Sequence, residues 1–226
     1  MSNKFEALKT QVESGDDSGS GDEDIGGYVV NPDTLPPLEI PPTEHKLQYP
    51  YWLWFSRYTK SAARLNSTQG YTQALRLVGR CGSVEQWWSM YCHLARPSEL
   101  PPTTDLHLFK SGIRPMWEDP ANTRGGKWVI RLRKGLAGRA WENLCMAMLG
   151  EQFMVGGEIC GAVLSVRFQE DLVSLWNRTA TDQTSVARVR DTLKRVLNLP
   201  ANANMEYKSH GDSLRASKVI STVVKS

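Results

Sequence analysis

Residues 114–120, Arg-Pro-Met-Trp-Glu-Asp-Pro, place a large aromatic side chain directly beside a carboxylate. Because prolines disfavour helix interiors and central strands, we expect this segment to be a fixed loop. Trp117 offers a flat π-face and Glu118 a two-oxygen acceptor, a combination that suits a flat, cationic ligand with N–H donors. A guanine base methylated at N7 is one ligand of this kind. The alternative is that Trp117 anchors the loop in the core while Glu118 faces water.

The charges of the chain are unevenly distributed. Residues 1–44 carry ten acidic and two basic side chains, whereas the whole chain has a net charge of +3. Residues 45–226 therefore carry a net charge of +11. A basic body joined to an acidic tail indicates a polyanionic ligand. The alternative is that these charges serve solubility alone.

The N-terminal segment lacks the apolar side chains that a folded domain needs. Residues 13–27 are mostly Gly, Ser, Asp and Glu, and residues 31–43 hold five prolines. We therefore predict a disordered tail over residues 1–44, one folded domain over residues 45–210 and a flexible tail over residues 211–226.

Cysteine spacing and hydropathy indicate the compartment. The four cysteines, at positions 81, 92, 145 and 160, form no C-x-x-C pair, which favours free thiols over disulfides or zinc ligands. The sequence shows no N-terminal apolar signal segment and no apolar run of membrane-spanning length. We expect a cytoplasmic protein.

Hydrophobic periodicity divides the domain into strands and three helices. Strands are predicted at 52–55, 75–78, 128–133, 159–168, 172–177 and 205–209. Helices are predicted at 84–94, 141–149 and 185–197, the first opened by a capping box of Ser83 and Gln86 and the third capped by Ser185. This order predicts an α+β fold in which helices cover only the convex face of a curved antiparallel sheet. The concave face is left for a ligand.

The strands at 159–168 and 172–177 are predicted to pair with Arg167 opposite Leu172. Alternation along the strands then places Arg167 and Trp176 together on the uncovered face. The covered face receives the apolar set Ala162, Leu164, Val166 and Phe168.

Three apolar side chains fall outside the core stripes of their helices. Val84 and Trp88 are rotated from the main stripe of the first helix, and Met146 lies off that of the second. They predict an exposed surface for a protein partner. The alternative for the first helix is one broad core face.

Several of these motifs together resemble the translation initiation factor 4E family, the proteins that bind the 5′ cap of messenger RNA. The matching stretches are residues 115–118, 124–128, 160–163, 166–167 and 83–88. The resemblance runs from about residue 45 to residue 210 and keeps the family's order. It implies a sheet of about eight antiparallel strands backed by three long helices.

The resemblance also implies a role for each residue of a cap site. Those residues are Tyr71, Trp117, Glu118, Lys127, Arg167 and Trp176. The implied 7-methylguanine stacks between Tyr71 and Trp117, and Glu118 accepts its N1 and N2 donors. Trp176 lies against the N7-methyl group, while Arg167 and Lys127 meet the phosphates.

Three positions depart from the better-known family members. Tyr71 replaces a tryptophan, Leu172 replaces a phosphate-binding lysine, and Lys127 replaces an arginine. Each change predicts weaker cap affinity. Together with the long loop 57–70, these changes are typical of the 4E-homologous protein subgroup, which residues 44–49, 135–137 and 152–156 also resemble. That subgroup occupies caps and represses translation without efficiently recruiting the large scaffold factor of initiation.

The resemblance further implies a surface that binds helices carrying Tyr-x-x-x-x-Leu-apolar, here those of repressor proteins. Its positions are His45, Leu47, Val84, Trp88, Glu142, Asn143, Met146 and Gly150. They include the three apolar residues that lie off the helix stripes. Lys46 replaces a proline of the family pattern.

Two other functions compete with cap-dependent repression. One is an activating cap-binding initiation factor, and the other is a general single-stranded RNA binder whose affinity ignores N7 methylation. An enzyme is not expected, because the sequence holds no H-E-x-x-H, Walker-type or G-x-G-x-x-G motif. No cofactor or metal is expected either.

Overall fold

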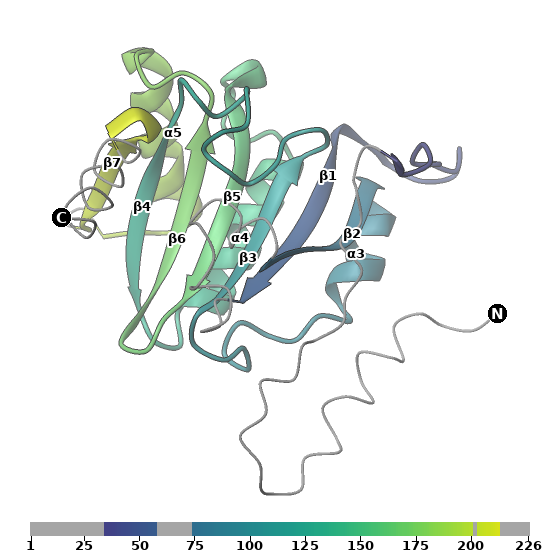
Figure 1. The fold of residues 1–226 in the computed structure, drawn as a ribbon, viewed down its shortest axis with the longest axis horizontal. Helices are drawn as coiled ribbons and strands as arrows, with labels where there is room; N and C mark the ends of the chain where they lie inside the picture. The colour runs from purple at the N-terminus through teal and green to yellow at the C-terminus, as the bar shows by residue number, and fades with distance from the viewer. Residues whose placement is uncertain (1–33, 58–73, 201–202, 213–226) are drawn as a thin grey trace, which may run out of the picture.

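The computed structural model describes residues 34–57, 74–200 and 203–212. The strands are β1 Lys46–Arg57, β2 Leu75–Ser83, β3 Thr104–Lys110, β4 Gly126–Arg133, β5 Ile159–Val166, β6 Glu170–Asn177 and β7 Met205–Ser209. The helices are α3 Val84–Tyr91, α4 Ala137–Leu149 and α5 Gln183–Val196, with a short 3-10 helix, η3, at Gly156–Glu158. Figure 1 shows their arrangement.

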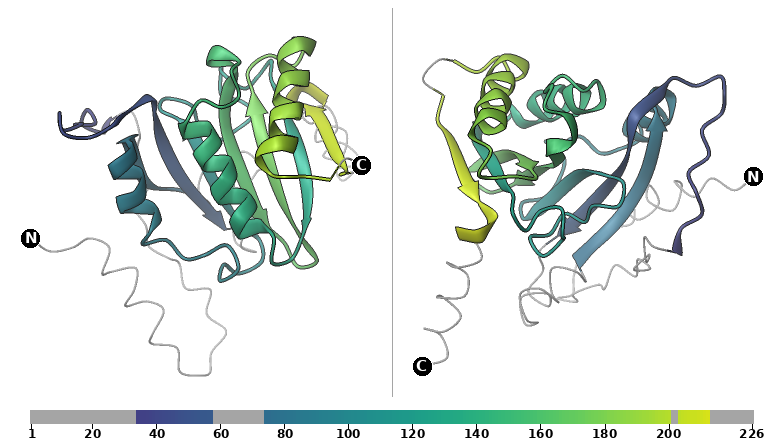
Figure 2. Two further views of the ribbon diagram at one scale, coloured as in Figure 1. Left: turned by 180° about the vertical axis from the view of Figure 1, so that it is seen from behind. Right: turned by 90° about the horizontal axis from the view of Figure 1, so that it is seen from above.

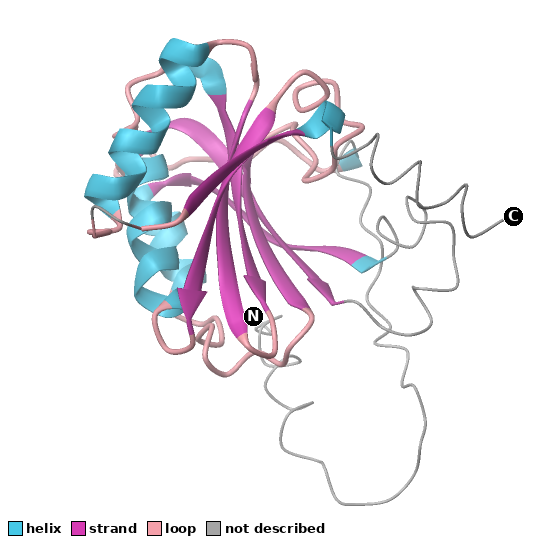
Figure 3. Cartoon of the chain, turned by 90° about the vertical axis from the view of Figure 1, so that its left-hand side faces the viewer, coloured by secondary structure: helices cyan, strands magenta, loops and turns pink. Residues whose placement is uncertain are grey.

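One curved antiparallel sheet organises the described chain. Its strand order is β2-β1-β3-β5-β6-β4-β7, so seven strands stand where about eight were expected. Helices α3, α4 and α5 all lie on the same side of it (Figures 2 and 3). The predicted α+β fold with helices on one face is confirmed. We call the opposite side the open face.

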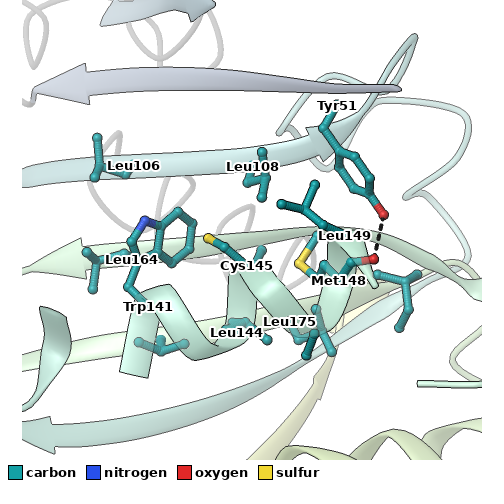
Figure 4. Packing of buried hydrophobic residues seen from close by; sticks show 14 of the residues in the cluster. Tyr51, Leu106, Leu108, Trp141, Leu144, Cys145, Met148, Leu149, Leu164 and Leu175 are labelled. Atoms are coloured by element: carbon teal, nitrogen blue, oxygen red, sulfur yellow. Dashed lines mark hydrogen bonds between the residues drawn. The ribbon is translucent and has the colours of Figure 1, made fainter. Parts of the chain in front are cut away.

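Alternation along the strands sorts side chains between the two faces. Leu53 of β1, Leu108 of β3 and Ala162 of β5 share the helix-covered face, because each lies opposite the next across the sheet. The helix α4 supplies the matching layer. Its side chains Trp141, Cys145, Met148 and Leu149 point toward the sheet (Figure 4), and all are buried.

The predicted stripe of α4 is therefore confirmed. Tyr51 closes this core at one edge, where its hydroxyl donates to the carbonyl of Met148 at 3.1 Å. Burying such large side chains stabilises the sheet–helix interface by about 1.5–3 kcal/mol for each of them.

The β5–β6 hairpin pairs two residues away from the predicted register. Ser165, not Arg167, lies opposite Leu172, and Gly161 lies opposite Trp176. Because side chains alternate with period two, this slip leaves every residue that lies within the two strands on its predicted face. The prediction for Phe168 is wrong: β5 ends at Val166, and Phe168 is 77% exposed in the turn.

The predicted helix caps and the predicted end of β2 agree only in part with the structure. The serine cap of α3 is confirmed, since the backbone N–H of Gln86 donates to the Ser83 hydroxyl at 3.0 Å, and the Gln86 side chain reaches back to accept from the Gly82 N–H at 2.9 Å. The α5 cap is Asp182, whose carboxylate accepts from the Ser185 amide at 3.1 Å, so the prediction of Ser185 as the cap is wrong. Strand β2 does not stop at Gly79 but continues to Ser83.

Strand β3 was not predicted, because its polar residues hide the alternation. Asp105 and His107 both lie on the open face, and His107 is buried at 1% exposure. Its ring lies 2.9 Å from the Ser56 hydroxyl, a hydrogen bond between buried groups. Burial lowers the pKa of His107 to about 4, which keeps the ring neutral at physiological pH.

Part of the segment that we assigned to the N-terminal tail contacts β2 and α3. The carbonyl of Pro36 accepts from Arg80 at 2.7 Å, and the carbonyl of Glu39 accepts from Gln86 at 2.8 Å. The rest of the predicted tail, and residues 213–226 of the C-terminal tail, lie outside the described residues. No helix in the described ranges is long and apolar enough to cross a membrane.

The close approach of Phe109 to Gly161 gives a stability prediction. A Cβ at position 161 would overlap the Phe109 ring. We expect Gly161→Ala to destabilise the domain by about 1–3 kcal/mol, because overpacking forces buried rings to move. The measurement is the denaturant midpoint, with Gly157→Ala as the control, since a Cβ at Gly157 meets nothing within 4 Å. Equal midpoints for the two variants would contradict the prediction.

Candidate functional site

The loop that carries Trp117 is fixed by two buried polar side chains. The carboxylate of Asp119 accepts from the amides of Arg114 and Ala121, both at 2.9 Å. The side-chain amide of Asn122 donates to the carbonyls of Arg114 at 2.9 Å and Met116 at 2.8 Å. These bonds satisfy the backbone of a segment that has no strand partner, so they hold Trp117 in place.

A cluster of buried apolar residues forms the floor of the site. Trp176 of β6 is 4% exposed and meets Phe109 of β3 edge to face, with ring centroids 5.4 Å apart. Gly161 of β5 provides the room for that Phe109 ring. Trp117 is half-buried and packs against the same cluster from the loop. One tryptophan from the loop and one from the sheet therefore lie over a common floor.

The ring of His210, directly after β7, packs on Trp176. The two ring centroids are 4.2 Å apart. Burial lowers the pKa of His210 to about 3, with a smaller effect from the charge of Lys127, so the ring is neutral. This residue supports Trp176 from the side of β7.

Lys127 of β4 lies between the two tryptophans. Its Nζ is 5.9 Å from the Trp117 ring centroid and 5.4 Å from that of Trp176. Among the described residues, no carboxylate lies within ion-pair distance of this ammonium. Burial lowers the pKa of Lys127, and the charge of Lys208 adds to the effect. The site therefore holds a cation whose counter-charge is left for a ligand.

Arg167 follows β5 and lies on the open face as predicted. Its guanidinium donates to Asp105 at 2.7 Å and to the carbonyl of Val166 at 2.9 Å. Asp105 lies opposite Ser165, which places this ion pair on the open face. Six residues separate Arg167 from Gly161, so the arginine stands roughly 20 Å along the sheet from Trp176.

The structure thus brings together some predicted site residues and leaves others apart. Trp117, Lys127 and Trp176 converge, and Arg167 lies farther along the same face. Glu118 is exposed next to Trp117. Tyr71 lies outside the described residues. Sequence reasoning missed Asp119, Asn122 and His210, although an Asp and an Asn between prolines and glycines are recognisable turn residues.

The predicted partner surface lies on the opposite side of the molecule, on α3 and α4. Val84 and Trp88 are 40% and 41% exposed, so the broad-core alternative for α3 is wrong. Trp88 contacts the Tyr91 ring edge to face at 5.9 Å. Glu142 of α4 pairs at 3.8 Å with Arg96, which follows α3, so the two helices are neighbours here.

The remaining positions of this surface differ in exposure. His45 is held at the start of α3, where its amide donates to the Glu85 carboxylate at 2.8 Å. Asn143 donates to the carbonyl of Val196 at 3.4 Å, and Met146 is half-buried beside the core. Gly150 is exposed, but Leu47 is 8% exposed and lies in the core. Leu47 therefore supports the surface from beneath.

Comparison with known proteins places this architecture in one family. The model of the family described as eukaryotic initiation factor 4E matches residues 46–223. Translation initiation factor 4E-4 of Caenorhabditis elegans is 51% identical over 172 residues, which cover 76% of this chain and 80% of that protein. Translation initiation factor NCBP of Arabidopsis thaliana is 45% identical over 201 residues, covering 88% of this chain and 89% of that protein.

Solved structures agree with the sequence relatives. A complex of C. elegans eIF4E-3 with the 4E-binding protein Mextli and a cap analog superposes with a TM-score of 0.71 at 37% identity. It covers 76% of this chain and 96% of that chain. Ascaris suum eIF4E-3 with the m7G cap gives a TM-score of 0.69 at 36% identity, covering 74% and 92%. The chain therefore belongs to the eukaryotic initiation factor 4E family, whose members are cap-binding translation factors and not enzymes.

Proposed function

We propose that the open face binds the 7-methylguanosine 5′ cap of messenger RNA and that the protein thereby represses translation initiation. The proposed location is the cytoplasm, including RNA granules. The convergence of Trp117, Trp176 and Lys127 carries the cap-binding part of this proposal. The cap complexes of the C. elegans and A. suum relatives support it.

In this proposal the methylated base stacks on Trp117. N7 methylation gives the purine a delocalised positive charge, and a cation over an aromatic face gains about 0.5–2 kcal/mol. Glu118, exposed beside Trp117, accepts the two N–H donors of the base edge. The buried ring of Trp176 bounds the N7-methyl group, and Tyr71 supplies the second stacking face.

The positions of Lys127 and Arg167 indicate the direction of the phosphate chain. Lys127 lies at the two tryptophans and Arg167 farther along the open face, so the triphosphate runs from the first toward the second. Asp105 holds the Arg167 guanidinium on that path. Leu172 lies on the open face across from Arg131 and offers no charge to a phosphate. We therefore infer a moderate cap affinity with one cationic contact fewer than in the better-known members.

The repressor role rests on residue identities and on the partner surface. Tyr71 and Leu172 are typical of the subgroup that occupies caps without recruiting the scaffold factor. Exposed Val84 and Trp88 provide an apolar surface for a helix carrying Tyr-x-x-x-x-Leu-apolar. The alternative is activation through the scaffold factor, which the names of several relatives as initiation factors favour.

The stacking model predicts the behaviour of Trp117→Ala. Loss of one aromatic face costs about 1–3 kcal/mol, which corresponds to roughly 5- to 150-fold weaker binding. We expect the variant to lose retention on immobilised 7-methyl-GTP while its unfolding midpoint stays near that of the wild type, because Trp117 lies in a loop at the edge of the core. Trp88→Ala is the matched control and should be retained. Wild-type retention of Trp117→Ala would refute the site.

The partner surface predicts that Trp88→Ala, which should keep cap binding, loses affinity for a protein partner. Trp88→Ala should weaken binding of a Tyr-x-x-x-x-Leu-apolar helical peptide at least tenfold by calorimetry, since aromatic anchors dominate helix-in-groove interfaces. Met154→Ala is the control, because Met154 is 78% exposed but lies outside this surface. Equal losses in both variants would argue against a specific surface.

The same variant separates repression from activation. When the protein is tethered to a reporter messenger RNA, we expect lower reporter output, and Trp88→Ala should restore it. Higher output from the tethered wild type, with the scaffold factor co-purified, would instead support an activating factor.

A further inference from the structure

The turn between β5 and β6 presents an aromatic ring to solvent at one end of the open face. Phe168 is 77% exposed, while the neighbouring strand residues Val166 and Val173 are buried. A single exposed apolar side chain needs no explanation by itself. The residues around Phe168 decide what its ring can bind.

Those residues include several basic side chains, which continue the path of the cap site. Arg131 and Arg133 of β4 lie opposite Leu172 and Glu170, so both share the open face with Lys127. At about 3.4 Å per residue, Arg131 stands roughly 14 Å and Arg133 roughly 20 Å from Lys127 along the strand. Arg167 directly precedes the exposed ring, and Figure 1 shows β4, β6 and β5 side by side in this region.

Most of these cations already have acidic partners. Arg131 pairs with Glu170, and Arg167 pairs with Asp105. Lys134, just beyond β4, pairs with Asp171 at 2.6 Å.

Arg133 differs from these three cations. It is exposed, and no carboxylate of the described residues lies within ion-pair distance of it. The region therefore offers a ligand one uncompensated cation and one aromatic face, in addition to the remaining donors of the paired arginines.

We propose that Phe168 and Arg133 bind the RNA chain that follows the cap, with Phe168 stacking on one of its first nucleobases and Arg133 meeting a phosphate. This inference rests on the proposed cap-binding function, since the cap fixes where that chain begins. An exposed ring among cations, continuous with a phosphate path, suits single-stranded RNA because every base has a π-face and every link a negative charge. Stacking outweighs charge here, since Arg131, Lys134 and Arg167 already pair with carboxylates of the described residues.

The test compares two ligands, 7-methyl-GTP and a short capped oligoribonucleotide, by fluorescence titration of the full chain. The wild type should bind the capped oligonucleotide more tightly than 7-methyl-GTP. Phe168→Ala should remove most of that gain and leave the affinity for 7-methyl-GTP unchanged, whereas Phe168→Trp should keep the gain. Met154→Ala, which removes an equally exposed apolar side chain elsewhere, should behave as the wild type.

Salt dependence separates the contribution of the Arg133 charge from that of stacking on Phe168. Arg133→Ala should reduce the slope of log affinity against log salt for the capped oligonucleotide by about 0.7, the value of one phosphate contact on a single strand. Phe168→Ala should leave that slope unchanged while lowering the affinity.

Each outcome has a distinct meaning. Equal wild-type affinities for the two ligands, or an unchanged gain in Phe168→Ala, would overturn this inference and leave the cap-binding proposal intact. A wild type that fails to bind 7-methyl-GTP would overturn the cap-binding proposal first, and this inference with it.

Discussion

The packing of Phe109 against Gly161 fixes the geometry on which the candidate site depends. Without a side chain at position 161, the Phe109 ring can lie over β5 and meet Trp176 edge to face. Trp176 is then held between Phe109 and His210, and its strand partner Lys127 projects beside it. The positions of the candidate site's side chains on the open face therefore depend on close packing within the sheet.

The three helices make this arrangement possible, because they cover one face of the sheet and bury its central side chains. With α4 packed across β1, β5 and β6, the open face is free to carry a lysine, a neutral histidine and aromatic rings. Trp117 comes from a loop, but the side chains of Asp119 and Asn122 give that loop a fixed shape. Rigid strands thus supply the floor and the cations, and a braced loop supplies the stacking face.

The partner surface uses the remaining apolar surface of the helices. Trp87 of α3 is fully buried, whereas Trp88, one residue on, is 41% exposed. One residue on a helix corresponds to a rotation of about 100°, so two adjacent tryptophans serve the core and a partner separately. The candidate cap site and the partner surface lie on opposite sides of one sheet, so the two ligands of the proposed function would not compete for the same face.

Periodicity predicted much of this fold from the sequence. The stripe of α4 and the alternation in β5 and β6 were strong enough that a register error of two residues changed no face. Strand β3 escaped prediction because a single sequence does not reveal that the polar side chains Asp105 and His107 share the open face. The α5 cap was misplaced because Asp182 and Ser185 are both good capping residues, and the structure uses the serine amide as a donor to the aspartate.

Sequence reasoning identified site residues whose types suit a ligand. It missed the residues that hold other site residues in place. Trp117 stood out as a π-face beside a carboxylate, whereas Lys127 was assigned only through the family resemblance. Asn122 and His210 did not stand out, because each acts on a neighbour, the first on two carbonyls and the second on the Trp176 ring. Such roles depend on long-range packing that a local pattern does not contain.

The most direct test of the account is a tryptophan fluorescence titration of the wild-type protein with 7-methyl-GTP and with unmethylated GTP. If the open face recognises a positively charged purine, 7-methyl-GTP should quench the fluorescence with an affinity at least tenfold higher than that of GTP. Equal affinities for the two nucleotides would contradict the account and indicate a general phosphate or RNA-binding surface.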